Sequence, residues 1–295
     1  MSQCIPSGPA SSILARLPSV FRAPCPRPPP RSIILTVSQK PKRLKLIACE
    51  VFARELSYSA ALSPHIVDIV FTEKAAHDRS AYLRELIRSK IDEAENDEVG
   101  YDAILLGFGL CGTAVVGVSS KRLPLVMPRA HDCCTLFLGS RKAFKQHFSE
   151  NPSTPFSSAG YLERGSGDDY LRESTLSETL GINKTYEQYV ELYGEENAQY
   201  IIDTLNPAGA EQADNRVVFI DVPEFSHLGY AEKCREIAEA EGKEFVLLRG
   251  DIRLFLKLTR GEWDDDEFLV LEPGRQVTPC YDWDRIVSAG ADDAT

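Results

Sequence analysis

The sequence predicts an α/β protein with two Rossmann-like lobes, mainly parallel sheets, and a site in the crevice at the carboxyl ends of the strands. Three observations predict this class. Short apolar, β-branched runs alternate with segments of helical spacing, and this alternation occurs in two separate stretches of the 295-residue chain. The content of 43% hydrophobic and 26% charged residues is that of a globular protein. Strands that alternate with helices form βαβ units, whose parallel strands end at one edge of a sheet.

The first lobe is expected over residues 44–155. Four apolar runs, several of them rich in β-branched residues, predict its strands: 44–49, 66–72, 103–107 and 123–128. Segments in which apolar residues recur three and four positions apart predict its helices: 50–62, 78–94 and 132–147.

A second lobe is expected over residues 206–284. Residues 156–205 connect the two lobes, first as a crossing segment rich in Ser, Gly and Thr, and then as an amphipathic helix over 184–205. The second lobe repeats the alternation, with three strands and two helices: strands 216–221, 244–249 and 268–272, helices 230–241 and 252–259. Residues 285–295 are expected to form a flexible tail.

The first 43 residues differ in composition from the rest of the chain. Residues 1–48 hold eight Lys and Arg but no Asp or Glu, and the segment is rich in Ser and Pro. A basic, Ser-rich and acid-free N-terminus is typical of a transit peptide, which predicts a mitochondrial or other organellar location. A disordered tail on a cytoplasmic protein is the alternative. Residues 1–43 are therefore excluded from the predicted fold.

Charge and hydropathy exclude two classes of partner. The chain has 44 Asp and Glu against 33 Lys and Arg, a net charge of -11. This argues against nucleic-acid binding, which depends on basic side chains that neutralise phosphates. No uncharged apolar run reaches the ~18–20 residues of a membrane-spanning helix. The expected partner is a small-molecule ligand.

Candidate metal ligands follow four consecutive predicted strands. Each strand delivers a thiol or an imidazole to the same edge of the sheet: Cys49, His77, Cys111, and His131 with Cys133. Thiolate and imidazole hold zinc, and thiolates hold iron–sulfur clusters. Cys49 and Cys133 also lie at predicted helix N-termini, which favour the thiolate. The sequence therefore predicts zinc or an iron–sulfur cluster, although each residue alone could equally be a core or helix-start residue.

Neighbouring residues supply the remaining predicted roles. Arg129 and the glycine-rich turn at Gly109 are expected to bind an anionic substrate group. Glu50 and Asp132 are expected to act as acid, base or partners of the ligands. The acidic run Asp264–Glu267 is interpreted as a solvated turn. Cys134 and Cys234 are interpreted as core residues.

Short motifs spread over residues 44–275 resemble one known family. The matching pieces are Ile47-Ala-Cys-Glu50, Gly107-Phe-Gly-Leu-Cys-Gly112, Pro128-Arg-Ala-His-Asp-Cys133, Leu138-Gly-Ser140, Tyr193-Gly-Glu-Glu-Asn-Ala198, Gly250-Asp-Ile-Arg-Leu254, Gly261-Glu-Trp, Phe268-Leu-Val and Pro273-Gly274. The family is known only as a domain of unknown function, common in methanogens and anaerobic bacteria with some eukaryotic members. Its prokaryotic members often lie near corrinoid methyl-transfer systems, which implies a partner protein in a methyl-transfer or cofactor pathway. The chain lacks the D-x-H-x-x-G motif of corrinoid carriers.

Together these features predict a metal-binding α/β protein that acts as an enzyme on a small anionic or thiol/methyl substrate. The reaction would be that of a metal-dependent transferase, with methyl or thiol chemistry, or of a lyase. A non-enzymatic carrier of a metal, cofactor or tetrapyrrole is the first alternative. A structural protein with buried core cysteines is the second.

Overall fold

The computed structural model describes residues 40–74, 79–110, 113–148, 156–164, 190, 216–280 and 285–290. The contacts of the chain separate residues 1–38 from residues 39–295, and every described residue belongs to the second unit. Most of the predicted tail 1–43 and most of the predicted helix 184–205 therefore lie outside the described residues. So do His77 and Cys111.

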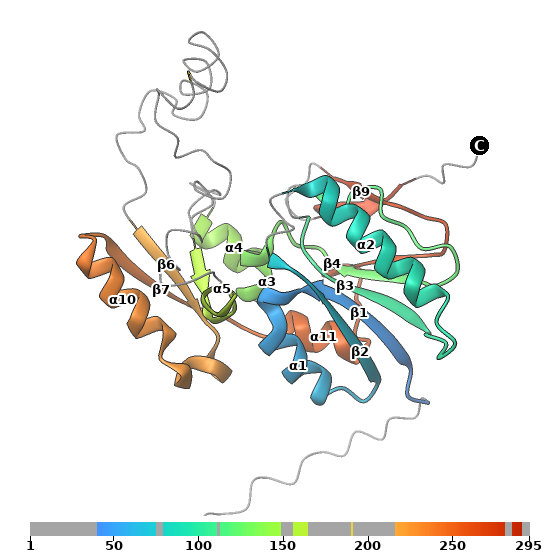
Figure 1. Cartoon of the computed structure of the whole chain (residues 1–295), viewed down its shortest axis with the longest axis horizontal. Coiled ribbons are helices and arrows are strands. Elements are labelled where there is room, and N and C mark those ends of the chain that lie inside the picture. Colours follow the sequence, from blue (N-terminus) through green and yellow to red (C-terminus); the bar gives the residue numbers. More distant parts are fainter. Residues whose placement is uncertain are drawn as a thin grey trace, which may run out of the picture. The chain divides into compact units, whose positions relative to one another are not determined.

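A five-stranded sheet forms the larger part of the described structure (Figure 1). Its order is β2-β1-β3-β4-β8, with the strands β1 (Arg43–Cys49), β2 (Ile66–Thr72), β3 (Ala103–Gly107), β4 (Leu125–Pro128) and β8 (Phe268–Leu271). The first four strands are parallel, and β8 runs antiparallel to β4. Every residue of β3 and β4 is buried, as expected for strands at the centre of a sheet covered on both faces.

Helices cover both faces of this sheet. The 3-10 turn η1 (Glu50–Phe52) continues into α1 (Ala53–Ala61), which packs against α11 (Arg253–Arg260). The helix α2 (Ser80–Glu95) lies on the other side of the sheet from α1 and α11 (Figure 1). Its buried residues Leu83, Ile87 and Ile91 recur every four positions, which is the pattern that predicted the helix. The opposite placement of α1 and α2 is what right-handed crossovers predict when the chain passes from β1 to β2 and back across β1 to β3.

A second sheet contains three parallel strands in the order β5-β6-β7. Its elements are β5 (Phe156–Ser158), α5 (Ala159–Glu163), β6 (Arg216–Asp221), η4 (Pro223–Leu228), α10 (Tyr230–Ala240) and β7 (Glu244–Arg249). Leu162, Phe219 and Cys234 form a small core beneath α10. The interpretation of Cys234 as a packing residue is confirmed.

The remaining described elements belong to the turns around the first sheet. They are α3 (Cys133–Phe137), α4 (Arg141–Phe148) and the antiparallel strands β9 (Val277–Pro279) and β10 (Val287–Ala289). None of the helices within the described ranges is both long enough and apolar enough to cross a membrane.

The predicted class, a mainly parallel α/β structure, is confirmed, but one expected strand joins the other sheet and one strand of the second sheet was not expected. The pattern at 268–272 predicts a strand of the second lobe, whereas β8 pairs with β4 at the edge of the first sheet. Its residues Phe268, Leu269 and Leu271 are buried there. Conversely, β5 starts the second sheet from within the expected crossing segment. Hydrophobic alternation identifies a strand but carries no information about its partner.

Candidate functional site

Loops that follow strands of the first sheet contact loops that follow strands of the second. The backbone of η1 lies so close to α5 that a Cβ atom on Gly160 would lie 1.7 Å from the carbonyl oxygen of Val51. Elsewhere in the same junction, the backbone N–H of Asp251 donates to the carbonyl oxygen of Phe137 at 2.9 Å. The carboxyl ends of parallel strands from both sheets therefore meet, which is the usual location of a ligand site in α/β proteins.

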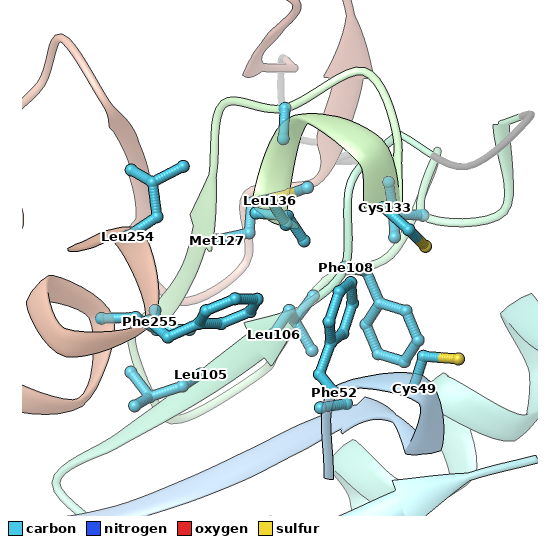
Figure 2. Close-up of a cluster of buried hydrophobic side chains, with 14 of the residues drawn as sticks. Cys49, Phe52, Leu105, Leu106, Phe108, Met127, Cys133, Leu136, Leu254 and Phe255 are labelled. Carbon is cyan, nitrogen blue, oxygen red and sulfur yellow. The ribbon is translucent and has the colours of Figure 1, made fainter. Parts of the chain in front are cut away.

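Two cysteines from distant parts of the sequence lie together at this junction. Cys49 is the last residue of β1 and Cys133 the first residue of α3, and both are buried, with exposures of 5% and 8%. Figure 2 shows both sulfur atoms pointing to the same side of the cluster, beside the rings of Phe52 and Phe108. The structure thus brings together the two predicted ligands that lie farthest apart in the described sequence.

Burial dominates the acidity of Cys49. Removal of the thiol from water raises its pKa well above the ordinary value, and the nearby Cys133 raises it further. A hydrogen bond from the backbone N–H of Val51 lowers the pKa, as expected for a sulfur at a helix N-terminus, but by less. The expectation that this helix N-terminus favours the Cys49 thiolate is therefore wrong, because desolvation outweighs the hydrogen bond. The raised pKa of the Cys134 thiol has the same first cause, and its 1% exposure confirms it as a core residue.

Glu50 lies beside the thiol pair within a group of charged residues. Its carboxylate accepts a hydrogen bond from the backbone N–H of Lys74 at 2.8 Å and lies 3.8 Å from the Arg164 guanidinium. The Lys74 ammonium lies 5.6 Å from the centroid of the Tyr161 ring, and its charge also acts on Cys49. One carboxylate and two cations thus surround the end of β1.

Sequence reasoning missed three of these residues. Lys74 follows β2 by two positions, so the rule that selects residues after strand ends could have found it. Tyr161 and Arg164 follow β5, a strand of three residues that no hydrophobic run in the sequence indicates. They could not have been found without the structure.

The turn after β3 packs directly against the turn after β4. A Cβ atom on Gly109 would lie 2.7 Å from the Cα and N atoms of Asp132, so only glycine permits this approach. The backbone N–H of Leu110 donates to the carbonyl oxygen of Ala130 at 2.8 Å. Gly109 is therefore required for backbone packing, and its binding of substrate stays a prediction.

A strained residue follows this turn. Thr113 has a φ of 76°, a left-handed conformation that β-branched residues rarely adopt. Its carbonyl oxygen accepts a hydrogen bond from the Arg84 guanidinium at 2.8 Å, and Arg88 on the same helix donates to the carbonyl oxygen of Gly117 at 2.9 Å. Strain of this kind persists where surrounding contacts hold it, and it is concentrated at functional sites.

Asp132 caps a helix, and the surroundings of His131 favour its neutral form. Asp132 is the N-cap of α3, and its carboxylate accepts hydrogen bonds from the backbone N–H and the hydroxyl of Thr135 at 3.0 and 3.2 Å. Burial raises the pKa of Asp132. Burial, and then the charge of Arg141, lowers the pKa of His131, whose ring lies 5.5 Å from that of Phe144. A neutral imidazole is the form that binds metals.

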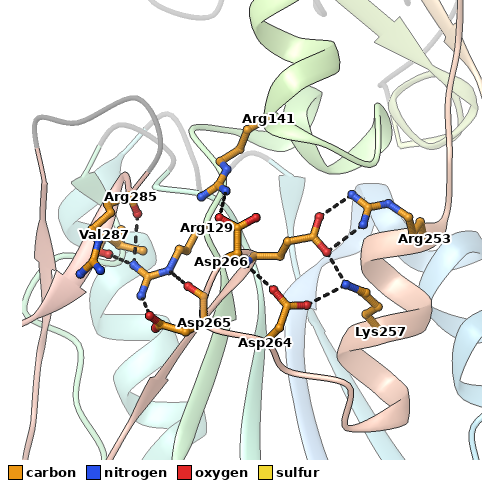
Figure 3. A network of polar contacts seen from close by, with 10 residues as sticks. Arg129, Arg141, Arg253, Lys257, Asp264, Asp265, Asp266, Arg285 and Val287 are labelled. Carbon is orange, nitrogen blue, oxygen red and sulfur yellow. Dashed lines mark hydrogen bonds and ion pairs between the residues drawn. The ribbon is translucent and has the colours of Figure 1, made fainter.

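Arg129 belongs to a different network, shown in Figure 3. Its side chain is 4% exposed and donates to the carbonyl oxygens of Asp265 (2.9 Å), Arg285 (3.2 Å) and Val287. It also forms an ion pair with the Asp265 carboxylate at 3.0 Å. These contacts join β4 to the C-terminal segments of the chain. Substrate binding by Arg129 stays a prediction, and no contact described here favours it.

The acidic run Asp264–Glu267 supplies the carboxylates of this network. Asp265 and Asp266 are more than 80% exposed, as a solvated turn requires. Glu267, in contrast, is 16% exposed and accepts a hydrogen bond from the Arg253 guanidinium at 2.7 Å. Lys257 pairs with both Asp264 and Glu267. The interpretation of the run as a solvated turn is thus wrong for Glu267, whose position is set by two cations of α11.

A family model described as "Protein of unknown function (DUF1638)" matches residues 71–259, more than half of the chain. The chain belongs to this family. The match confirms the resemblance inferred from short motifs. No curated protein and no solved structure matches the chain.

The matched DUF1638 region runs from the end of β2 into α11, so it spans elements of both sheets and includes Cys133. Cys49 and Glu50 precede it. Among the residues that the structure describes, no three His, Cys, Asp or Glu side chains are grouped as a metal ion would require. The described part of this DUF1638 protein therefore contains two of the predicted ligands near each other, Cys49 and Cys133, whereas His77 and Cys111 lie outside it.

Proposed function

We propose that this DUF1638 protein binds a zinc ion or an iron–sulfur cluster through Cys49 and Cys133, and that it is an enzyme acting on a small anionic or thiol/methyl substrate. The observation that carries the proposal is the meeting of two thiols from distant strand ends at the junction of two parallel sheets. Cys111 and His77 would be the further ligands, since they follow Leu110 and Lys74 in the sequence. His131, the alternative to His77, is not grouped with both cysteines in the described part of the chain.

The chemistry of the donors fits a soft metal. The side chains of Cys49 and Cys133, beside Phe52 and Phe108, are shielded from water, which suits thiolate coordination. The raised pKa of Cys49 opposes ionisation in the chain alone, and a positive metal charge would reverse that balance because a coordinating thiol loses its proton. A zinc ion with an open position would polarise a bound thiol or water.

The residues around the thiols support an anionic substrate. The Arg164 guanidinium lies 3.8 Å from the Glu50 carboxylate, and the charge of the Lys74 ammonium acts on Cys49, so an anionic group could bind at either cation. Glu50 would then hold or accept a proton next to the bound substrate. Methyl or thiol transfer, or elimination by a lyase, are the reaction classes proposed, with a partner protein of a methyl-transfer or cofactor pathway.

The burial of both cysteines also favours a second candidate, a protein in which they only fill the core. Buried cysteine behaves as a small hydrophobic residue. A carrier that holds a metal, cofactor or tetrapyrrole without catalysis would use the same thiols as the enzyme. Metal content distinguishes the structural role from the enzyme and from the carrier.

Metal analysis of protein purified without oxygen tests the proposal. We expect about one zinc ion per chain, or several irons with a brown colour. Cys49→Ala and Cys133→Ala are expected to lose this metal, whereas Cys134→Ala, which alters the neighbouring and equally buried thiol, is expected to retain it. Metal-free wild-type protein, or full metal content in folded Cys49→Ala and Cys133→Ala variants, would contradict the proposal.

We also propose that residues 1–43 direct the protein to a mitochondrion or another organelle. The support is the segment's composition, in which arginines and serines occur without any acidic residue. A fluorescent protein fused behind residues 1–43 is expected to enter the organelle, and the same fusion carrying Arg16→Glu and Arg22→Glu is expected to stay in the cytoplasm. Cytoplasmic fluorescence from both fusions would refute organellar targeting.

A further inference from the structure

The carboxyl group of Glu55 on α1 is buried without full hydrogen bonding. Glu55 is 1% exposed, and within the described ranges its Oε2 atom has no hydrogen-bond partner. One helical turn later, the hydroxyl of Ser59 is buried in the same condition. An ionised carboxylate in such a place is costly, because protein contacts do not replace the water that it loses.

The charged groups that face Glu55 come from three elements. Arg54 lies on α1, Glu163 at the end of α5, and Glu224 in η4. The Arg54 guanidinium is bound to both oxygens of Glu163 at 2.7 and 2.9 Å, and the Tyr230 hydroxyl donates to Glu163 at 3.0 Å. Arg54 therefore has another carboxylate to neutralise, while Glu163 and Glu224 add negative charge near Glu55.

On its other side α1 packs against α11. There the Thr259 hydroxyl of α11 donates to the carbonyl oxygen of Ser59 at 3.2 Å. Tyr58 and Phe225 extend the contact between α1 and η4, with ring centroids 6.1 Å apart. Glu55 thus lies where α1 of the first sheet meets α5 and η4 of the second.

We propose that Glu55 makes the packing of α1 against α5 and η4 depend on pH: the protonated carboxyl packs stably, and its ionised form loosens the contact. Loosening of this contact would also shift residues of the candidate site, because both helices are connected to it. Through η1, α1 continues from the strand end that carries Cys49 and Glu50, and α5 carries Tyr161 and leads to Arg164. The inference concerns packing alone and does not depend on a bound metal.

The direction of the effect follows from proton linkage. Burial, and then the charge of Glu163, raises the pKa of Glu55 from 4.5 to about 7, against a smaller opposing effect of its own backbone N–H and of Arg54. The folded protein then holds this proton more tightly than the unfolded chain does. The stability contributed by the neutral form is fully present below pH 4.5 and is lost as the pH rises through about 7.

Hydrogen–deuterium exchange at pH 5.5 and 8.5 tests this inference. Peptides from α1 and α5 are compared between wild type and Glu55→Gln at the same pH, which cancels the intrinsic pH dependence of exchange. We expect equal exchange at pH 5.5 and exchange at least tenfold faster in wild type at pH 8.5. Glu85→Gln on α2, which removes an exposed carboxylate paired with Arg88, is the matched control and is expected to match wild type.

Wild-type protein alone provides a second measurement. Protection of α1 is expected to fall relative to protection of α2, which lies on the other side of the first sheet, between pH 5.5 and 8.5. This comparison holds even where Glu55→Gln folds poorly. Equal protection ratios at the two pH values would overturn the inference.

Discussion

Replacing Arg129 by methionine is expected to lower the free energy of unfolding by about 3 to 5 kcal/mol, because carbonyl oxygens around the buried side chain lose their donor at a cost of about 1 to 3 kcal/mol each. The guanidinium is buried and is a common donor to three backbone carbonyls and one carboxylate. Methionine fills a similar volume but donates no hydrogen bond, so the buried carbonyl oxygens would be left unpaired.

Urea denaturation followed by circular dichroism measures this loss, and Arg141→Met is the matched control. Arg141 also pairs with the acidic run, but its partner Asp266 is 82% exposed, so a loss below about 1 kcal/mol is expected. A stable Arg129→Met protein that no longer binds substrate would instead favour the role predicted from the sequence.

Replacing Gly160 by alanine is expected to destabilise the protein by at least about 3 kcal/mol, at the upper end of the cost of overpacking. The new methyl carbon would lie 1.7 Å from the carbonyl oxygen of Val51, and both sides of this contact are backbone. No side-chain rotation can relieve the overlap, so α5 would have to move away from η1. We also expect slower and weaker metal uptake, because Cys49 directly precedes η1.

The control for Gly160→Ala is Gly242→Ala. A Cβ atom on Gly242 would meet nothing within 4 Å, and its φ of 67° gives only the strain of a left-handed alanine, about 1 kcal/mol. Thermal and urea unfolding of both variants measure the difference. A loss of only about 1 kcal/mol in Gly160→Ala, no greater than that in Gly242→Ala, would show that the close approach of Val51 carries no large cost.

The sequence predicted the local elements of the fold better than their partners. Helix spacing located α2, and the apolar runs located β1 to β4, because burial patterns repeat within each element. The pairing of β8 with β4 joins residues far apart in the chain, and no periodicity encodes such a choice. The short strand β5 has too few residues for a pattern to be visible.

The sequence could predict those residues of the candidate site that directly follow the strands it indicates. Cys49 and Cys133 were predicted to lie near each other because parallel strands end at one edge, and the structure places both beside the rings of Phe52 and Phe108. The balance between hydrogen bonding and desolvation at Cys49 was not predictable, since it depends on how deeply the thiol is buried. Likewise, the contacts of Arg129 depend on carbonyl oxygens of Asp265, Arg285 and Val287, which reach it only after the C-terminal segments fold back.

The position of β8 has a consequence for biosynthesis. About 140 residues separate the end of β4 from the start of β8. A ribosome adding ~5–20 residues per second therefore leaves the β4 edge unpaired for roughly 7 to 30 s. During that interval the nascent chain exposes an apolar strand edge, the kind of surface that chaperones protect from aggregation. A chain terminated before Phe268 would keep that edge open permanently.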